Sequence, residues 1–386
     1  MADGRSATLQ RNISILVEDG RISWIRPTGG EEDPDGATAI DCAGATFVPG
    51  MVDCHSHVTG PGGANWIERF NDPPDVLASV AEHNGRIAMA AGVRWMRDVG
   101  SPIGVDPEDG QERALALGVR DRWAVRADRP YLRAAGSWLF KRGVNPMRSA
   151  IEAETGDELL AAAIRQLELG ADLVKLYMDG PDVNVSPWTA NEVARVVDAV
   201  HERGARVAAH SSRVNGAREA VPGGVDSIEH GFDLDADVAA EMAARGTTLV
   251  STLAVMHSWL SFGDTTTIER FAGEAGRSTI QGRLEQAEAS VRTARNAGVA
   301  IATGSDFGGG SVRANQLAWE VTSMVAAGLE PVDALAAATW RGGELIDEEE
   351  AGVIREGGPA ELFLVHGDPL SDPAALWRVW RTAWER

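Results

Sequence analysis

The sequence has little cysteine and no long apolar run, and each shortage excludes a class of protein. Cys42 and Cys54 are the only two cysteines, so the fold has no framework of disulfides. No window approaches the roughly 18 uncharged apolar residues that a membrane span needs. Residues 1–20 lack the apolar stretch of a secretory signal. We therefore expect a cytoplasmic protein without membrane spans.

Positive charge is also scarce. Lysine and arginine number 36 against 57 aspartates and glutamates, which gives a formal net charge of −21 and a sequence pI near 4.8. Nucleic acids and anionic membranes are bound through basic surface, so this balance disfavours both as partners. Hydrophobic residues make up 44% of the chain, which is enough for a substantial core. We expect a folded protein whose partner is a small molecule.

Short runs rich in valine, isoleucine and alanine alternate with longer amphipathic stretches, which is typical of repeated βα units. Helices are predicted at 157–170, 191–204 and 280–298, each closed by glycine. Eight strands with intervening helices predict an α/β fold, a (β/α)8 TIM barrel. The predicted strands are 51–58, 92–100, 130–136, 171–178, 205–211, 225–231, 247–253 and 299–306.

The two ends of the chain have a different pattern. Residues 8–48 alternate like short antiparallel strands around an Asp19-Gly20 turn, and residues 351–368 have the same character. We expect a small β-sandwich built from both termini. The expected domains are therefore residues 1–48 plus 350–386 for the sandwich and 49–349 for the barrel.

A His-x-His pair lies in the first predicted barrel strand. His55 and His57 are two residues apart, so both imidazoles project from one face of the strand. Two surface histidines would be the simple alternative. Active sites of such barrels form at the carboxyl ends of the strands, however, and neutral imidazole is a good zinc ligand. We therefore interpret the pair as metal ligands.

Four further residues recur at the same structural position. Lys175, His210, His230 and Asp306 lie at or near the carboxyl ends of the fourth, fifth, sixth and eighth predicted strands. A lysine ammonium has no free lone pair. Reaction of its neutral amine with carbon dioxide would give a carbamate that bridges two metal ions. The alternative for Lys175 is an ion pair within the barrel. An N-carboxylated Lys175 would suit a site for two divalent ions, zinc or else manganese, and both interpretations of Lys175 stay open on the residues alone.

These motifs together resemble the amidohydrolase superfamily. His-Ser-His after Pro-Gly, the fourth-strand lysine in VKLYMDG, and VAAHS, DSIEHG and ATGSDFG carry the resemblance. VRWMRDVGSP, LEPVDALAAAT and GVIREGGPAELFLVHGDPL extend it over essentially the whole chain, in its imidazolonepropionase-like and prolidase-like (Xaa-Pro dipeptidase-like) branch. The resemblance implies a metal-dependent barrel that hydrolyses amide or related C–N bonds, often as a homo-oligomer. The bridging lysine is a feature of the prolidase-like members.

The resulting hypothesis is a metal-dependent amidohydrolase for a dipeptide or N-acyl amino acid. One metal is held by His55, His57 and Asp306 and the other by His210 and His230, with Lys175 and a hydroxide shared. Attack by that hydroxide, with Asp306 as general base, would cleave the amide. Cyclic-amide hydrolysis or deamination, and lactone or ester cleavage, are alternatives on the same site. A non-catalytic barrel homologue is a further alternative.

Four residues are candidates for substrate binding. Tyr177 shares the strand face of Lys175, although packing inside the barrel would explain it equally well. Arg213 follows the fifth-strand histidine, where relatives have a tyrosine for the substrate carboxylate; a helix-cap role is its alternative. His257 follows the seventh strand, where a plain loop histidine is the alternative. Trp138 lies in GSWLFKRGVN, where relatives often have Gly-Gly-His-Gly.

Overall fold

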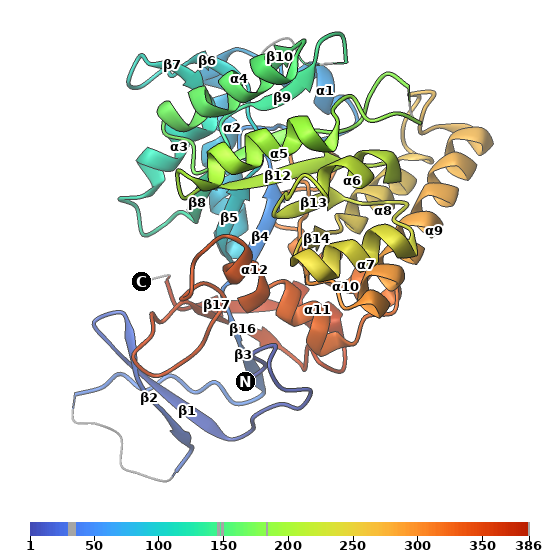
Figure 1. Cartoon of the computed structure of the whole chain (residues 1–386). Coiled ribbons are helices and arrows are strands. Elements are labelled where there is room, and N and C mark those ends of the chain that lie inside the picture. Colours follow the sequence, from blue (N-terminus) through green and yellow to red (C-terminus); the bar gives the residue numbers. More distant parts are fainter. Residues whose placement is uncertain (30–35, 145–146, 148–149, 183, 385–386) are drawn as a thin grey trace.

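Eight parallel strands form the centre of the molecule in the computed structural model, which describes residues 1–29, 36–144, 147, 150–182 and 184–384 (Figure 1). Every strand predicted for the barrel is present, with its end residues shifted by a few positions. The strands are β4 (Met51–Ser56), β5 (Val93–Asp98), β8 (Tyr131–Ala134), β11 (Leu173–Tyr177), β12 (Arg206–Ser211), β13 (Ser227–His230), β14 (Thr248–Val250) and β15 (Ile301–Ala302).

The strands pair in chain order. One sheet has the order β4-β5-β8, and a seven-stranded sheet has the order β10-β9-β11-β12-β13-β14-β15, where β9 is Trp138–Lys141 and β10 is Ile151–Ala153. The amide of Asp172 donates to the Ala134 carbonyl (2.8 Å) beside β8 and β11. At the other edge the Cys54 amide donates to the Thr303 carbonyl (2.9 Å). These bonds join the two sheets into a barrel-like parallel sheet.

Helices surround the strands, as Figure 1 shows. The predicted helices at 157–170, 191–204 and 280–298 are confirmed by α4, α5 and α9. Helix α5 begins with a capping box of Thr189 and Glu192, which satisfies free amides at its start. The helices are α1 (Trp66–Arg69), α2 (Pro74–Ala90), α3 (Leu115–Trp123), α4 (Gly156–Glu168), α5 (Ala190–His201), α6 (Val214–Ala220), α7 (Ala236–Arg245), α8 (Leu253–Phe262), α9 (Gly273–Ala297), α10 (Leu317–Ala326), α11 (Pro331–Ala337) and α12 (Trp340–Leu345).

Length and polarity together mean that no helix in the described part of the chain could cross a membrane. The longest of them, α9, contains four arginines along its length. Buried positions recur along α9, where Ile280 and Leu284 pack in a cluster with α8 and Val291 joins the main core. The helix is therefore an amphipathic cover of the barrel.

The terminal segments form antiparallel strands at one end of the molecule (Figure 1). Strands β1 (Ile13–Glu18) and β2 (Arg21–Pro27) make a hairpin whose Asp19 and Gly20 both have positive φ, of 50° and 77°, as the predicted turn requires. A second sheet has the order β17-β16-β3, from Val379–Thr382, Leu362–His366 and Ala45–Pro49. The antiparallel strands are confirmed, whereas their assembly as a sandwich stays a prediction.

Two short elements complete the fold. Strands β6 (Ile103–Val105) and β7 (Glu112–Ala114) form a hairpin between β5 and α3, and η1 (Pro373–Trp377) is a 3-10 turn before β17. They lie outside the parallel sheet.

The buried carboxylate of Glu320 forms hydrogen bonds to the start of α8. Glu320 of α10 is fully buried and accepts hydrogen bonds from Ser251 Oγ (2.6 Å) and the Ala254 amide (2.7 Å). The N-cap residue of α8, Thr252, makes no side-chain cap bond, so Glu320 supplies that acceptor from another helix. Burial raises the pKa of Glu320 from 4.5 to about 7, because the charged form loses its hydration.

Glu320→Gln should therefore flatten the pH dependence of stability. In the wild type the unfolded chain loses this proton near pH 4.5 and the folded chain only near pH 7. The free energy of unfolding should fall as pH rises through that window, by about 3 kcal/mol for this group. Urea unfolding at pH 4.5 and pH 7.5 measures the difference. Parallel profiles for the two proteins would show that Glu320 ionises normally.

Candidate metal centre and pocket

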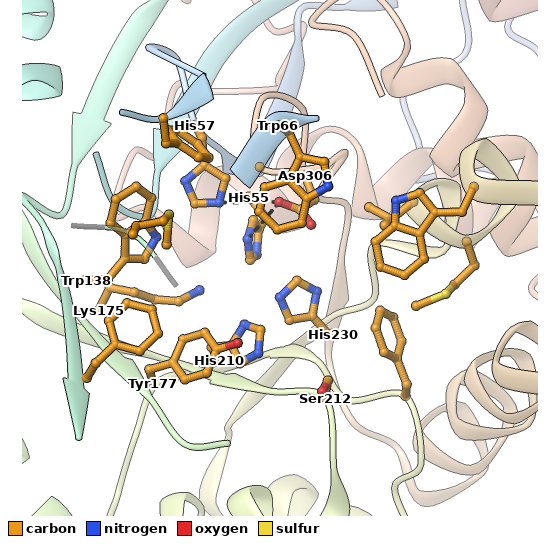
Figure 2. Close-up of a pocket in the computed structure, with 18 of the residues that line it drawn as sticks. His55, His57, Trp66, Trp138, Lys175, Tyr177, His210, Ser212, His230 and Asp306 are labelled. Atoms are coloured by element: carbon orange, nitrogen blue, oxygen red, sulfur yellow. Dashed lines mark ion pairs between the residues drawn. The ribbon is translucent and has the colours of Figure 1, made fainter. Parts of the chain in front are cut away.

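The six residues predicted to bind metal converge on one pocket at the carboxyl ends of the strands (Figure 2). The pocket has a volume of about 200 Å³. The convergence follows from parallel pairing, because neighbouring strands end at the same edge of the sheet. The six lining residues are His55, His57, Lys175, His210, His230 and Asp306.

The two histidines of the first barrel strand each use one ring nitrogen to bond the protein. His55 Nδ1 donates to Glu229 Oε2 (2.7 Å), and His57 Nδ1 donates to the Gly100 carbonyl (2.7 Å). Their Nε2 atoms lie 3.5 and 3.3 Å from Asp306 Oδ1. This arrangement fixes both tautomers and leaves both Nε2 lone pairs facing one carboxylate.

The histidines of β12 and β13 are held in the same way. His210 Nε2 donates to Asp179 Oδ2 (3.0 Å), and His230 Nδ1 lies 2.8 Å from Thr252 Oγ1. The Ser212 hydroxyl also donates to Asp179, which therefore has a defined position. The free nitrogens are Nδ1 of His210 and Nε2 of His230. Burial lowers the pKa of His55 and of His230, which keeps these imidazoles neutral.

Backbone strain is concentrated at this site. Of the six described non-glycine residues with positive φ, His230 (73°) and Asp306 (51°) line the pocket, and Thr252 (49°) bonds the His230 ring. Such conformations cost free energy for a residue with a Cβ and persist where surrounding contacts enforce them. At Asp306 the amide donates to the His55 carbonyl (2.8 Å), which ties the strained residue to β4.

Close packing beside the ligands excludes larger side chains. A Cβ at Gly309 would lie 2.2 Å from His57 Cδ2, and one at Gly304 would lie 2.4 Å from His55 Cβ. Glycine at these two positions lets the last barrel strand and its loop approach β4. The loop after β15 can thereby present Asp306 to both histidines.

An ion pair behind the site holds His55 in place. Arg97 Nη2 donates to Glu229 Oε1 (2.7 Å), and the two side chains are 3% and 0% exposed. Ser227 Oγ donates to the same oxygen (2.5 Å), while Arg97 Nε donates to the Cys54 carbonyl (2.5 Å). Glu229 immediately precedes His230 on β13, so the two side chains leave the strand on opposite sides. Arg97 was not anticipated.

Lys175 reaches the centre of the ligand set. Its ammonium nitrogen points at the histidines in Figure 2, and it is buried with no hydrogen-bond partner among the described residues. The ion pair considered as an alternative for Lys175 is therefore not formed with any described carboxylate within 4.0 Å. Burial lowers the pKa of Lys175 to about 8, so the neutral amine is accessible near physiological pH.

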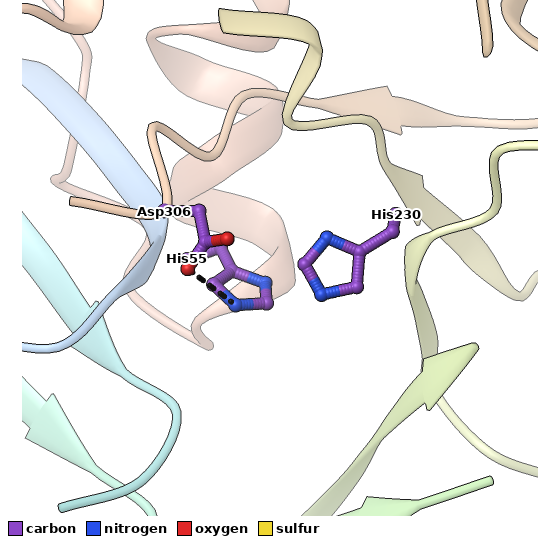
Figure 3. Close-up of side chains that lie close together, drawn as sticks. All are labelled: His55, His230 and Asp306. Carbon is purple, nitrogen blue, oxygen red and sulfur yellow. Dashed lines mark ion pairs between the residues drawn. The ribbon is translucent and has the colours of Figure 1, made fainter. Parts of the chain in front are cut away.

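Three of the candidate ligands form a tighter group. One ligand atom each of His55, His230 and Asp306 lies within 4.8 Å of the others (Figure 3). All three are buried, unlike the acidic clusters common on surfaces. His57 faces the same Asp306 oxygen, and the His210 ring lies 4.5 Å from that of His230. The donor set of imidazoles and one carboxylate suits zinc or a similar divalent ion.

Apolar side chains form most of the remaining wall. Trp138 was expected to contact substrate and lines the pocket, with its ring 5.5 Å from that of His57. Tyr177 also lines it, stacked between Phe140 (4.2 Å) and His210 (3.8 Å). The further apolar lining residues are Trp66, Phe70, Met147, Phe232, Val255, Met256 and Trp259.

Two other expected substrate residues lie outside the lining. Arg213 is the N-cap residue of α6, and its carbonyl accepts from Ser211 Oγ (2.6 Å). His257 lies on α8, where its ring stacks on Trp319 at 6.4 Å. Arg283 of α9 lines the pocket instead. Sequence periodicity gave no signal for Arg283, because an arginine on an amphipathic helix reads as a solvated residue.

The fold and the site define a metallohydrolase-like barrel, and the comparisons with known proteins agree. The profile of the Amidohydrolase family matches residues 46–382, so the chain belongs to this family. As the sequence predicted, it is a hydrolase of the class acting on carbon–nitrogen bonds.

The individual relatives have low sequence identity to this chain. An uncharacterized protein of Mycobacterium tuberculosis is 28% identical over 368 residues, covering 94% of this chain and 88% of its own. The imidazolonepropionase of Salinispora arenicola is 26% identical over 377 residues (92% and 86%). A solved Xaa-Pro dipeptidase with bound methionine superposes with a TM-score of 0.82 at 25% identity (98% and 95%).

Glu229→Gln should destabilise the protein by about 3–5 kcal/mol, because it leaves the buried Arg97 guanidinium without its counter-charge. The control is Glu241→Gln, which removes the exposed pair with Arg245 and should cost under about 1 kcal/mol. Urea unfolding measures both variants. Equal losses of unfolding free energy in the two variants would mean that the buried pair contributes no more to stability than the exposed pair.

Proposed function

We propose that the chain is a two-metal amide hydrolase acting on dipeptides or N-acyl amino acids. One observation carries the proposal: four histidines each have one ring nitrogen bonded to the protein and the other free, around an unpartnered buried lysine. Free lone pairs of neutral imidazoles, oriented by second partners, are what a preformed metal site needs. The chemistry of the donor set therefore fits divalent ions.

In this proposal His55, His57 and Asp306 hold one ion, and His210 and His230 hold the other. Zinc is the expected ion, with manganese as the alternative. Lys175 would bridge them after its neutral amine adds to the carbon of carbon dioxide and releases a proton. The buried Nζ without any partner supports this assignment, since an uncompensated ammonium there is costly. When bound, the ions would polarise the scissile carbonyl and make water a better nucleophile.

The side chains of the pocket would carry the remaining steps. Asp306 is the proposed general base: its carboxylate accepts a proton from the attacking water and passes it to the leaving nitrogen. The Tyr177 ring packs against His210 and would orient the substrate beside the reacting carbonyl. Trp138 would cover the substrate and exclude water.

The substrate class is inferred from the relatives together with the pocket. A solved relative is an Xaa-Pro dipeptidase, which supports hydrolysis of a small amide. Similarity to an imidazolonepropionase supports a second candidate, hydrolysis of a cyclic amide. The fourth-strand lysine favours the first candidate, because a bridging ligand has a purpose only with two metals. Metal content per chain separates them: two equivalents favour the dipeptidase-like reaction and one favours the cyclic-amide reaction.

We also propose the larger organisation expected from the sequence. Residues 49–349 would form the catalytic domain, and residues 1–48 with 350–386 a β-sandwich. Apolar side chains of both terminal sheets, among them Ile22 and Leu364, share one cluster, which supports this division. A homo-oligomer is expected, and sedimentation of the purified protein would test it.

Asp306→Asn should keep most of the bound metal but lower kcat about 10²- to 10⁴-fold, because the amide cannot accept the water proton. Elemental analysis gives the metal content, and hydrolysis of an N-acyl amino acid gives kcat. Asp75→Asn, on the exposed start of α2, serves as the control and should leave both values unchanged. Near-normal turnover by a metal-loaded Asp306→Asn enzyme would remove Asp306 from the general-base role.

Lys175→Ala should reduce metal content below two per chain and abolish the carbamate. The sequence has one other lysine, Lys141, whose ammonium contacts the Trp188 ring (4.7 Å) and which does not line the pocket. Labelling with 13C carbon dioxide and NMR should give one carbamate signal in the wild type and in Lys141→Ala. A signal that survives in Lys175→Ala would contradict the proposed modification.

A further inference from the structure

The pocket has two apolar walls that belong to different parts of the barrel. Phe70, Trp138, Phe140 and Met147 form one buried cluster, against which Trp66 packs. The second wall belongs to a cluster of α8 and α9 that includes Met256, with Phe232 and Trp259 packed against it. A substrate whose reacting carbonyl lies at the histidines would therefore direct one apolar group to each wall.

Arg283 introduces a positive charge at the second wall. It precedes Leu284 of the α8–α9 cluster, and it lines the pocket together with Met256 and Trp259. In the described part of the chain Arg283 makes no ion pair and no hydrogen bond. The other three arginines of α9 each have a partner: Arg277 bonds Asp264 (2.6 Å), Arg292 the Ala327 carbonyl (3.0 Å) and Arg295 the Gly328 carbonyl (2.7 Å).

The charges around Arg283 do not neutralise it. Arg283 is exposed on α9; partial loss of hydration and the nearby Arg213 lower its pKa, while Asp179 acts in the opposite direction. Asp179 accepts hydrogen bonds from His210 Nε2 and Ser212 Oγ and keeps its negative charge, but it forms no ion pair with Arg283 within 4.0 Å. Arg213 is offset by Asp233, on whose pKa it acts, whereas Arg283 offers the pocket a guanidinium without a described ion-pair partner, which an anionic group would complement.

Among the described lining residues, no free carboxylate is available to pair with a positively charged substrate group. Asp306 is the one carboxylate among the described lining residues, and its Oδ1 faces His55 and His57. A free α-ammonium, as in an unmodified dipeptide, would have to lose hydration against the aromatic wall without a counter-charge. An acylated amine avoids that cost.

We propose that Arg283 binds the carboxylate of the substrate and that the enzyme selects N-acyl amino acids with apolar groups on both sides of the amide. This inference rests on the proposed amide-hydrolase function and narrows it. The guanidinium fork matches a carboxylate in bidentate geometry, so one unpaired arginine suffices to orient the substrate. The acyl group would then lie on the Trp138 wall and the amino-acid side chain on the Trp259 wall.

The test compares N-benzoyl-L-phenylalanine with its carboxamide, which lacks only the charge, by following the release of benzoate. Arg283→Gln should lower kcat/KM for the acid about 10- to 100-fold, the usual effect of losing a charge-assisted hydrogen bond, and change the carboxamide under about 3-fold. Arg277→Gln, on the same helix, should change neither. The wild type should cleave N-benzoyl-L-phenylalanine at least about 10-fold better than phenylalanyl-phenylalanine, given the cost of burying the ammonium. Equal losses for acid and carboxamide in Arg283→Gln, or a preference for the free dipeptide, would overturn the proposal.

A binding measurement separates this inference from the proposed function. Trp66, Trp138 and Trp259 line the pocket, so ligand binding should change tryptophan emission even without turnover. N-benzoyl-L-phenylalanine should bind the wild type and Arg277→Gln alike, and Arg283→Gln about 10-fold or more weakly. Binding that depends on Arg283, without cleavage of any amide, would contradict the proposed amide-hydrolase function and support the carboxylate site. Binding that is unaffected by Arg283→Gln would refute the carboxylate site.

Discussion

The geometry of the pocket depends on the buried ion pair between Arg97 and Glu229. The pair crosses the barrel interior from β5 to β13, and Arg97 also bonds the Cys54 carbonyl of β4. Glu229 uses its second carboxylate oxygen for His55 Nδ1. One buried charge pair therefore fixes the spacing of three strands and the tautomer of a ligand. Such a pair is tolerated in the interior because each partner has additional hydrogen bonds.

Each of the four histidines is held by a hydrogen bond to a group outside the candidate ligand set, and this partner differs from one histidine to the next. A carboxylate, a backbone carbonyl, a second carboxylate and a threonine hydroxyl bond His55, His57, His210 and His230 in turn. Burial favours neutral rings at His55 and His230. The folded chain thus prepares lone pairs before any ion arrives, and the binding free energy need not be used to orient the ligands.

The sequence predicted the strands and the six inward residues because both follow from local regularities. Alternation in runs such as ADLVKLYM marks a buried strand, and parallel strands bring their ends together. The residues near the substrate could not be predicted from such local patterns. Arg213 follows a ligand in sequence, yet the chain turns there to start α6. Arg283 lies far along the sequence in a polar helix, and only the packing of α9 against α8 brings it to the pocket. Residues that pair across the barrel, such as Arg97 and Glu229, produce no periodic pattern in the sequence, so their pairing could not be predicted from it.

The barrel is uneven around its circumference. Strands β14 and β15 have three and two residues, against six in each of β4, β5 and β12. Few ladder hydrogen bonds therefore hold the sector that carries α8 and α9, and local opening should require least free energy there. The ligands of β4 and β12 lie on the well-paired strands. Amide protons should accordingly exchange faster along α8 and β14 than along β4 and β12. New substrate preferences could then arise by reshaping α8 and α9 while the four histidines keep their positions, and Asp306, which follows β15, is the candidate ligand most exposed to such changes.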